Sequence, residues 1–181
     1  KLGIMFNQRT NCVYRKIREM IRDGELGEIK RVNWIVTDWY RTQFYYDSGD
    51  WRATWSGEGG GVLFNQCPHQ LDLLQWVTGM MPARVQAFCH FGKWHDIEVE
   101  DEVTAYFRYK NGATGVFVTT TGETPGTNRF EVSGSRGKLL CNPIVCGGEI
   151  FESSVADNVI ASAGGRPILT KGKNFIWLRA V

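Results

Sequence analysis

Several features that would assign this chain of 181 residues to a special class are missing from its sequence. No apolar run approaches the roughly 20 residues that a membrane-spanning helix needs, so we expect no membrane partner. The first residues, Lys1-Leu2-Gly3-Ile4, show neither a signal-peptide layout nor an initiator Met. A start of this kind is compatible with a fragment or a processed chain. We expect a cytoplasmic location because the five cysteines, which are odd in number and form no Cys-x-x-Cys pair, are interpreted as reduced.

An excess of one charge sign is also missing. The sequence holds 21 Lys and Arg residues against 19 Asp and Glu residues, a formal net charge of +2, and both signs are mixed along the chain. A nucleic-acid-binding domain typically shows a basic stretch or patch. The even mixture argues against a nucleic-acid partner, and 43% hydrophobic residues with 22% charged residues is an ordinary globular composition.

Metal-binding and disulfide patterns are absent as well. Cysteine occurs five times, an odd number, with no Cys-x-x-Cys pair, and the three histidines are scattered. Structural zinc sites need closely spaced Cys and His ligands, so we expect no metal. We interpret the cysteines as reduced and mostly buried side chains. They are Cys12, Cys67, Cys89, Cys141 and Cys146.

Aromatic residues, in contrast, are abundant: they make up 13% of the chain and include seven Trp. One interpretation is a bulky core. The other is a carbohydrate site, in which flat rings lie against the C–H faces of a sugar. Composition alone leaves both interpretations open.

The N-terminal part of the sequence predicts short alternating elements. Residues 2–6 form an apolar run typical of a strand, and residues 7–11 are polar and turn-like. Residues 12–23 carry apolar side chains at helical spacing, and residues 28–38 are rich in β-branched and aromatic types, which favours a strand. Residues 39–58 follow neither period and are dense in Trp, Tyr and Arg. A loop of this length is usually functional.

A glycine run, residues 57–61, leads into a helical pattern that closes at Gly79. Pro68 lies inside this pattern and is expected to kink one continuous helix. The glycine run lacks the spacing of a phosphate-binding loop and indicates only that the backbone comes close to something.

The rest of the chain predicts mostly strands, and the dipeptide Asn111-Gly112 between two alternating runs is a strong hairpin signal. Alternation along residues 99–109 predicts a sheet with one covered face and one more polar face. Tyr106, Phe117 and several Thr are expected on the second face. Residues 153–174 are expected to be loose. The expected strands are 83–91, 99–109, 113–121, 128–133, 137–141 and 148–152.

The densest polar constellation lies on the predicted helix. Asn65, His69, Asp72 and Trp76 would share one helical face. An imidazole there could exchange a proton near neutral pH, Asn65 could hydrogen-bond a substrate hydroxyl, and Asp72 could orient His69 or cap a neighbouring backbone group. The alternative is that His69 is a satisfied structural histidine and Asp72 a packing residue.

The run GEGGGVLFNQCPHQLDLLQW resembles the signature of the glucose–fructose oxidoreductase / inositol dehydrogenase (Gfo/Idh/MocA) family. The resemblance extends to MFNQR and GELGEI near the start, to DWRATW before the glycines and to EVSGSRGKL near residue 131. These motifs span residues 1 to about 140 in the family's order, whereas residues 141–181 match it poorly.

The resemblance implies an α+β fold with a large, mostly antiparallel open sheet and helices packed on one face. Residues 1–6 would be the remnant of the last strand of an N-terminal Rossmann domain that is absent here. Residues 7–181 would be the substrate-binding and oligomerisation domain, truncated at its C-terminus. The parent protein would use NAD or NADP, and we expect no cofactor in this fragment alone, which would be inactive.

The resemblance also implies the site. His69 matches the family's catalytic acid/base, and Asn65 stands where many members have an Asp, which puts proton relay through residue 65 in doubt. Trp51, Arg52, Tyr45 and Asp72 are the expected substrate contacts, and Asn7 and Arg9 the expected cofactor contacts. The substrate would be a small sugar or cyclitol, and the chain is expected to form a homo-oligomer through its sheet face. The alternative is a non-catalytic sugar-binding or assembly domain.

Overall fold

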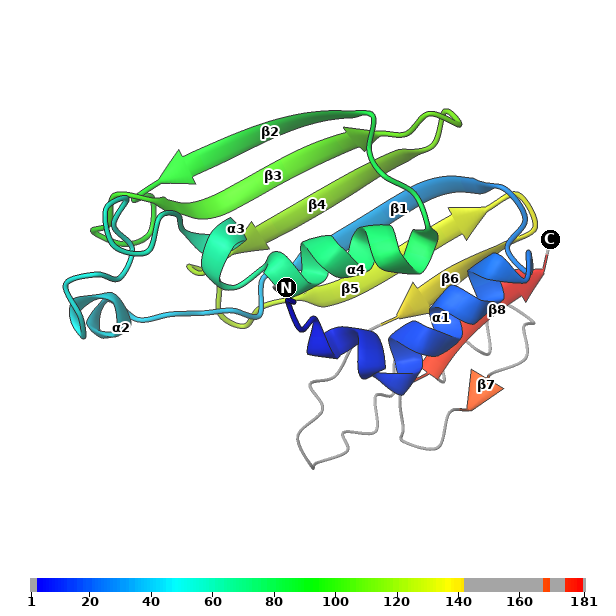
Figure 1. The fold of residues 1–181 in the computed structure, drawn as a ribbon, viewed down its shortest axis with the longest axis horizontal. Coiled ribbons are helices and arrows are strands. Elements are labelled where there is room, and N and C mark those ends of the chain that lie inside the picture. Colours follow the sequence, from blue (N-terminus) through cyan, green and yellow to red (C-terminus); the bar gives the residue numbers. More distant parts are fainter. Residues whose placement is uncertain (1–2, 142–167, 170–174, 181) are drawn as a thin grey trace.

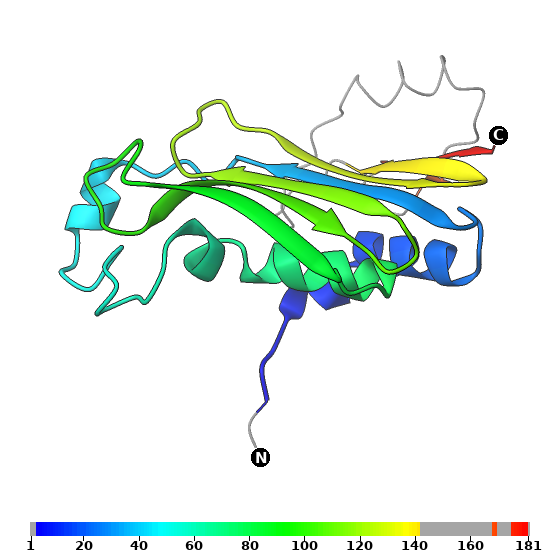
Figure 2. The same cartoon turned by 90° about the horizontal axis from the view of Figure 1, so that it is seen from above.

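A computed structural model of the chain describes residues 3–141, 168–169 and 175–180. They form an α+β domain in which one large sheet is covered on one face by helices (Figures 1 and 2). The expected fold class is confirmed. The expected strand 148–152 and most of the expected loose segment 153–174 lie outside the described residues.

The sheet has eight strands in the described residues, in the order β2-β3-β4-β1-β5-β6-β8-β7. All strand pairs are antiparallel except β1 with β4. The sequence predicted the first six strands to within about two residues at each end. The strands are β1 (Ile29–Val36), β2 (Arg84–Phe91), β3 (Glu100–Arg108), β4 (Thr114–Thr120), β5 (Asn128–Gly134), β6 (Gly137–Cys141), β7 (Ile168–Leu169) and β8 (Phe175–Ala180).

The helices are short and cluster on one side. A 3-10 helix, η1 (Asn7–Thr10), precedes α1 (Cys12–Arg22), and α2 (Gln43–Asp47) lies within the loop expected to be irregular. The expected single helix after the glycines is instead two helices, α3 (Val62–Asn65) and α4 (Pro68–Thr78). Figure 2 shows α1, α3 and α4 on the same side of the sheet.

The core lies between this helix layer and the sheet. Tyr14 and Ile17 of α1 and Leu73 of α4 pack toward strand residues such as Trp34 and Phe117, all of them buried. Burying apolar area at about 25 cal/mol per Å² is the main force that holds the helices on the sheet. Most core residues therefore lie on the strand faces that alternation predicted.

Phe117 corrects the sequence analysis in one respect. It was expected on the open face with Tyr106, but it is fully buried on the helix-covered face. The register explains this, because Ala105 pairs with Phe117 and Tyr106 pairs with Val116. Val116 is thus the residue of β4 that accompanies Tyr106 on the open face.

The N-terminal residues 3–6 carry no strand in this structure and extend away from the helix layer (Figure 2). Whether they complete the sheet of another domain stays a prediction. No helix in the described ranges is long and apolar enough to cross a membrane.

Candidate active site

The helix that carries His69 begins at Pro68 and not directly after the glycine run. Pro68 occupies the first turn of α4, where its missing N–H costs no helical hydrogen bond. Gln66 and Cys67 separate α3 from α4, and the amide of Cys67 donates to the carbonyl of Val62 at 3.0 Å. The expectation of one continuous face from Asn65 to Trp76 is therefore wrong for Asn65, whereas His69, Asp72 and Trp76 do belong to one helix.

The glycine run packs against the sheet. The amides of Gly61 and Leu63 donate to the buried carboxylate of Glu100 at 3.0 and 3.2 Å. A Cβ on Gly61 would lie 1.9 Å from the carbonyl oxygen of Glu100, so only glycine fits. The close approach expected of these glycines is therefore to β3.

A β-bulge in β3 accounts for the position of Glu100. The register with β2 shifts between His90, which faces Glu102, and Phe91, which faces Glu100. The extra residue at this point, Asp101, interrupts the alternation that would have kept Glu100 and Glu102 on one polar face. Glu100 is consequently buried, and the sequence analysis missed its role.

His69 lies half-buried in the first turn of α4. Its ring meets Phe6 edge-on, with the ring centroids 5.9 Å apart and the planes at 89°. Its Nδ1 is buried and has no hydrogen-bond partner among the described residues. A buried polar atom left unpaired costs about 1–3 kcal/mol, so it marks a position where a further hydrogen-bonding group would stabilise the site.

Asp72 is fully engaged by Arg9. The guanidinium donates from Nε to one carboxylate oxygen at 2.8 Å and from Nη2 to the other at 2.5 Å. The same guanidinium lies 5.4 Å from the Phe6 ring and 5.8 Å from the Trp76 ring. Asp72 therefore anchors η1 to α4. The expectation that Asp72 could orient His69 is not met, because both carboxylate oxygens bind Arg9. The hydrogen bond to Asp72 raises the pKa of Arg9.

Three expected substrate contacts do meet in the loop before the glycines. The guanidinium of Arg52 lies 4.5 Å from the rings of both Tyr45 and Trp51 and donates to the Tyr45 hydroxyl at 2.9 Å. We call Tyr45, Trp51 and Arg52 the aromatic–arginine cluster. Trp51 is 52% exposed, so the cluster offers an open ring face beside a cation.

Asn65 is linked to this loop. Its amide nitrogen donates to the Glu58 carboxylate, whose other oxygen accepts from the amide of Ala53 at 2.9 Å. Ala53 has a positive φ of 51°, a conformation that is strained for a residue with a Cβ. The amide of Glu98 also donates to the Ala53 carbonyl at 3.3 Å, so contacts on both sides hold the strained residue.

Asn7, the other residue expected to contact the cofactor, is exposed at the start of η1, on the same short helix as Arg9.

The tryptophans fit both interpretations of the aromatic content. Trp34 is buried in the core, as a bulky core would require, whereas Trp51, Trp55 and Trp94 are about half exposed. The described residues contain no group of three or more His, Cys, Asp or Glu side chains placed to hold a metal.

The fold and site together define an α+β domain with a histidine-bearing helix over a mostly antiparallel sheet. Residues 14–140 match the family model described as the GFO/IDH/MocA C-terminal domain, and the chain belongs to this family. The match ends at the point where the sequence analysis found the resemblance to weaken.

Similarity to known proteins agrees with this assignment. The chain is 31% identical over 109 residues to "Putative oxidoreductase YteT" of Bacillus subtilis, covering 56% of this chain and 24% of that protein. It is 26% identical over 139 residues to 1,5-anhydro-D-fructose reductase of Ensifer adhaerens, covering 77% and 40%. The chain thus spans less than half the length of these relatives.

A solved structure with a similar fold is the WlbA dehydrogenase of Bordetella pertussis, in complex with NADH and UDP-GlcNAcA. Its TM-score is 0.67 at 31% identity, over 73% of this chain and 40% of that one. The similarity supports both the fold and the family.

Proposed function

We propose that this chain is the substrate-side domain of an NAD(P)-dependent oxidoreductase that oxidises a secondary alcohol of a sugar or cyclitol. The observation that carries the proposal is His69, whose buried Nδ1 has no partner in the described part of a Gfo/Idh/MocA domain. Residues 7–181 would be the substrate-binding and oligomerisation domain. Residues 1–6 would be the remnant of the last strand of a nucleotide-binding domain.

The cofactor would be NAD or NADP. The sequence holds no G-x-G-x-x-G turn for a pyrophosphate, so that group would be bound outside this chain. Asn7 and Arg9 on η1 are the residues we propose to lie against the cofactor. Arg9 fits this role, because two of its five guanidinium N–H groups bind Asp72 and its side chain is 41% exposed.

The cofactor and the protein would each supply one part of the reaction. The bound nicotinamide supplies the hydride acceptor. His69, as a neutral imidazole, would take the proton of the hydroxyl whose carbon is oxidised, so that the alcohol leaves as a ketone. Asn65 does not titrate; its amide oxygen would accept from a sugar hydroxyl, and the aromatic–arginine cluster would stack on and donate to the ring.

The test is turnover of the full-length protein with NAD or NADP against a panel of sugars, cyclitols and UDP-GlcNAcA. His69→Ala should lower kcat about 10²–10⁴-fold, the usual effect of losing a general acid or base. His90→Ala, at an exposed position on β2, is the matched control and should keep wild-type turnover. Turnover of His69→Ala near the wild-type rate would return His69 to a structural role.

A non-catalytic sugar-binding or assembly domain is the second candidate. The observation that favours it is Asn65, which is bonded to Glu58 and stands where the resemblance to the family implies a titrating Asp. The substitution Asn65→Asp discriminates between the two. In an enzyme it should change the pH dependence of kcat, because it adds a titrating group, whereas a binding domain should show no turnover with any substrate of the panel.

We also propose that a second copy of the chain covers the open face of the sheet. Phe88, Tyr106 and Ile35 expose large apolar surface there, at 63%, 43% and 38%. A hollow of about 590 Å³ on this face is lined by both apolar side chains and charges of both signs, including Arg31, Arg129 and Glu131. Such a mixture is self-complementary across a two-fold axis.

This interface is tested by light scattering at high protein concentration. Tyr106→Glu should shift the chain toward monomer, because it replaces a large exposed ring of the proposed interface by an unpaired charge. Phe44→Glu, an equally disruptive change on the exposed surface of α2, should leave the mass unchanged. A monomeric wild type would overturn the proposal.

A further inference from the structure

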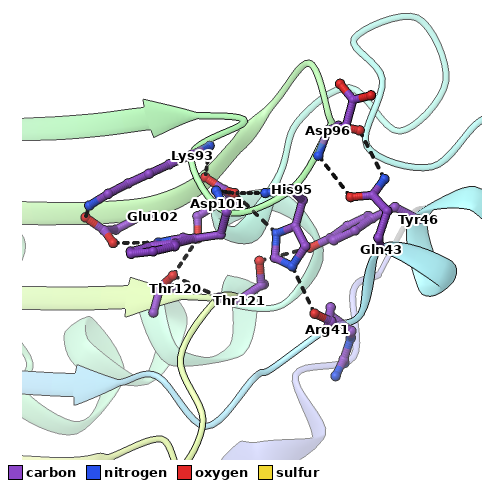
Figure 3. Close-up of polar contacts among 12 residues, drawn as sticks. Arg41, Gln43, Tyr46, Lys93, His95, Asp96, Asp101, Glu102, Thr120 and Thr121 are labelled. Carbon is purple, nitrogen blue, oxygen red and sulfur yellow. Dashed lines mark hydrogen bonds and ion pairs between the residues drawn. The ribbon is translucent and has the colours of Figure 1, made fainter.

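A second histidine, His95, is buried at the end of the sheet where the loop 92–98 meets the loop that carries α2 (Figure 3). Its Nδ1 lies 3.2 Å from a carboxylate oxygen of Asp101, and its Nε2 lies 2.9 Å from the carbonyl oxygen of Arg41. Both partners are acceptors. A neutral imidazole donates from one nitrogen only, and the tautomer decides which of the two contacts the ring makes as a donor.

Asp101, the bulge residue of β3, organises the loop that presents His95. It is fully buried, and its carboxylate accepts from the amides of Lys93, Trp94 and His95 at 3.0, 2.7 and 3.2 Å. Its backbone carbonyl accepts from the Thr120 hydroxyl and the Thr121 amide. One rigid side chain on a central strand thus fixes the backbone of the loop and the ring of His95.

The loop in turn fixes α2. The side chain of Gln43 exchanges two hydrogen bonds with the backbone of Asp96, at 2.9 and 3.2 Å. The ring of Tyr46 packs 4.9 Å from the His95 ring, and its hydroxyl donates to Thr121 at 3.0 Å. Figure 3 shows these groups converging from three segments far apart in the sequence.

These contacts also hold the aromatic–arginine cluster in place. Tyr45 lies next to the anchored Tyr46, with their ring centroids 5.2 Å apart, and the Arg41 guanidinium lies 5.0 Å from the Tyr45 ring. The apolar support of this region is small: Tyr46, Ala53 and Val99 form a separate cluster of buried residues. Polar contacts must therefore supply much of its placement.

We propose that His95, held by Asp101, is a positioning residue that sets the place of the aromatic–arginine cluster through the carbonyl of Arg41. The inference rests on the proposed function in one respect, that this cluster binds the sugar. His95 touches no reacting group and acts through the backbone between Arg41 and Tyr46. Its loss should weaken substrate binding and leave the proton transfer at His69 intact.

Two substitutions separate the two bonds of the ring. The amide nitrogen of Gln reaches the position of Nε2, so His95→Gln keeps the donor to the Arg41 carbonyl. The amide nitrogen of Asn reaches the position of Nδ1, so His95→Asn keeps the donor to Asp101 and loses the Arg41 contact. His90→Asn is the matched control at an exposed histidine.

The first measurement is amide hydrogen exchange of residues 41–53 in this 181-residue chain. His95→Asn should speed exchange there about tenfold and leave β1, β3 and β4 unchanged, and His95→Gln should restore protection. Equal exchange in wild type and His95→Asn would overturn the proposal. A general rise that includes the central strands would also overturn it, since His95 would then support the whole fold.

The second measurement is steady-state turnover of UDP-GlcNAcA by the full-length protein. His95→Asn should raise KM about tenfold with kcat within twofold, and His95→Gln should recover most of the affinity. A fall in kcat at unchanged KM would overturn the positioning role. If exchange responds as expected but the wild type turns over no substrate, the proposed function fails while the anchoring of the loop stands.

Discussion

His95 is buried and His69 is half-buried, and the surroundings of the two rings differ. His95 has an acceptor at each ring nitrogen, and its neighbours come from a central strand and two loops. His69 has a buried Nδ1 without a partner in the described residues, and its ring meets the Phe6 ring edge-on. An acceptor beside each ring nitrogen favours a structural role for His95, whereas the unpartnered Nδ1 of His69 leaves a position where a further group could bind.

The substitution Asp101→Ala, on the His95 side of this comparison, is expected to cause the largest loss of unfolding free energy. It removes the acceptor of three backbone amides and of the His95 ring, all in a buried site, and should lower the free energy of unfolding by about 3 kcal/mol. Urea denaturation of the chain measures this. Asp96→Ala, at an exposed neighbour, should change it by less than about 0.5 kcal/mol. Equal losses in both variants would contradict the structural role of Asp101.

A smaller loss is expected on the His69 side from Arg9→Met. The change keeps much of the side chain's length but leaves the buried Asp72 without its cation, which should cost about 2 kcal/mol of unfolding free energy. Arg15→Met, on the exposed surface of α1, is the matched control. An Arg9→Met protein as stable as the wild type would show that the pair adds nothing to the attachment of η1.

The smallest loss of stability is expected from a change at Tyr46, which lies beside His95. Burial raises the pKa of Tyr46, outweighing the opposite influence of its hydrogen bond to Thr121. A raised pKa in the folded state means that the neutral phenol stabilises the fold fully below its unfolded value of about 10. That contribution is lost as pH rises through the folded pKa.

Tyr46→Phe should therefore be less stable than the wild type by about 1 kcal/mol near pH 7, through loss of the Thr121 bond. The difference should shrink above about pH 10, where the wild type alone has a buried phenol to ionise. Denaturant midpoints at several pH values measure it. A difference that stays constant up to about pH 11 would count against burial as the cause.

Much of the fold could be predicted from local pattern. The alternation in β3 and β4 and the Asn111-Gly112 turn predicted the central hairpin, and Gly79 was correctly expected to close a helix. These features depend on residues close in sequence. The strand β8 was not predicted, and the parallel pairing of β1 with β4 was not visible, because pairing partners distant in sequence leave no local period.

The site was less predictable. The break between α3 and α4 places Asn65 on a separate short helix, where it binds Glu58, and the bulge at Asp101 turns Glu100 inward. Neither follows from spacing, because each depends on a contact across the fold. Asp101 lay inside the predicted strand 99–109, and His95 lay in the stretch between that strand and the predicted strand 83–91. Only their shared burial identifies them as a pair, and no sequence pattern carries that information.

The carboxylate of Glu100 has a consequence for the order in which the chain can fold. It binds the first amides of α3 from 39 and 37 residues away, and no side chain of the helix's own N-terminus does so. A helix of four residues has little stability by itself. We therefore expect the start of α3 to form only once β3 is in place, and a peptide covering residues 58–80 to begin its helix at Pro68.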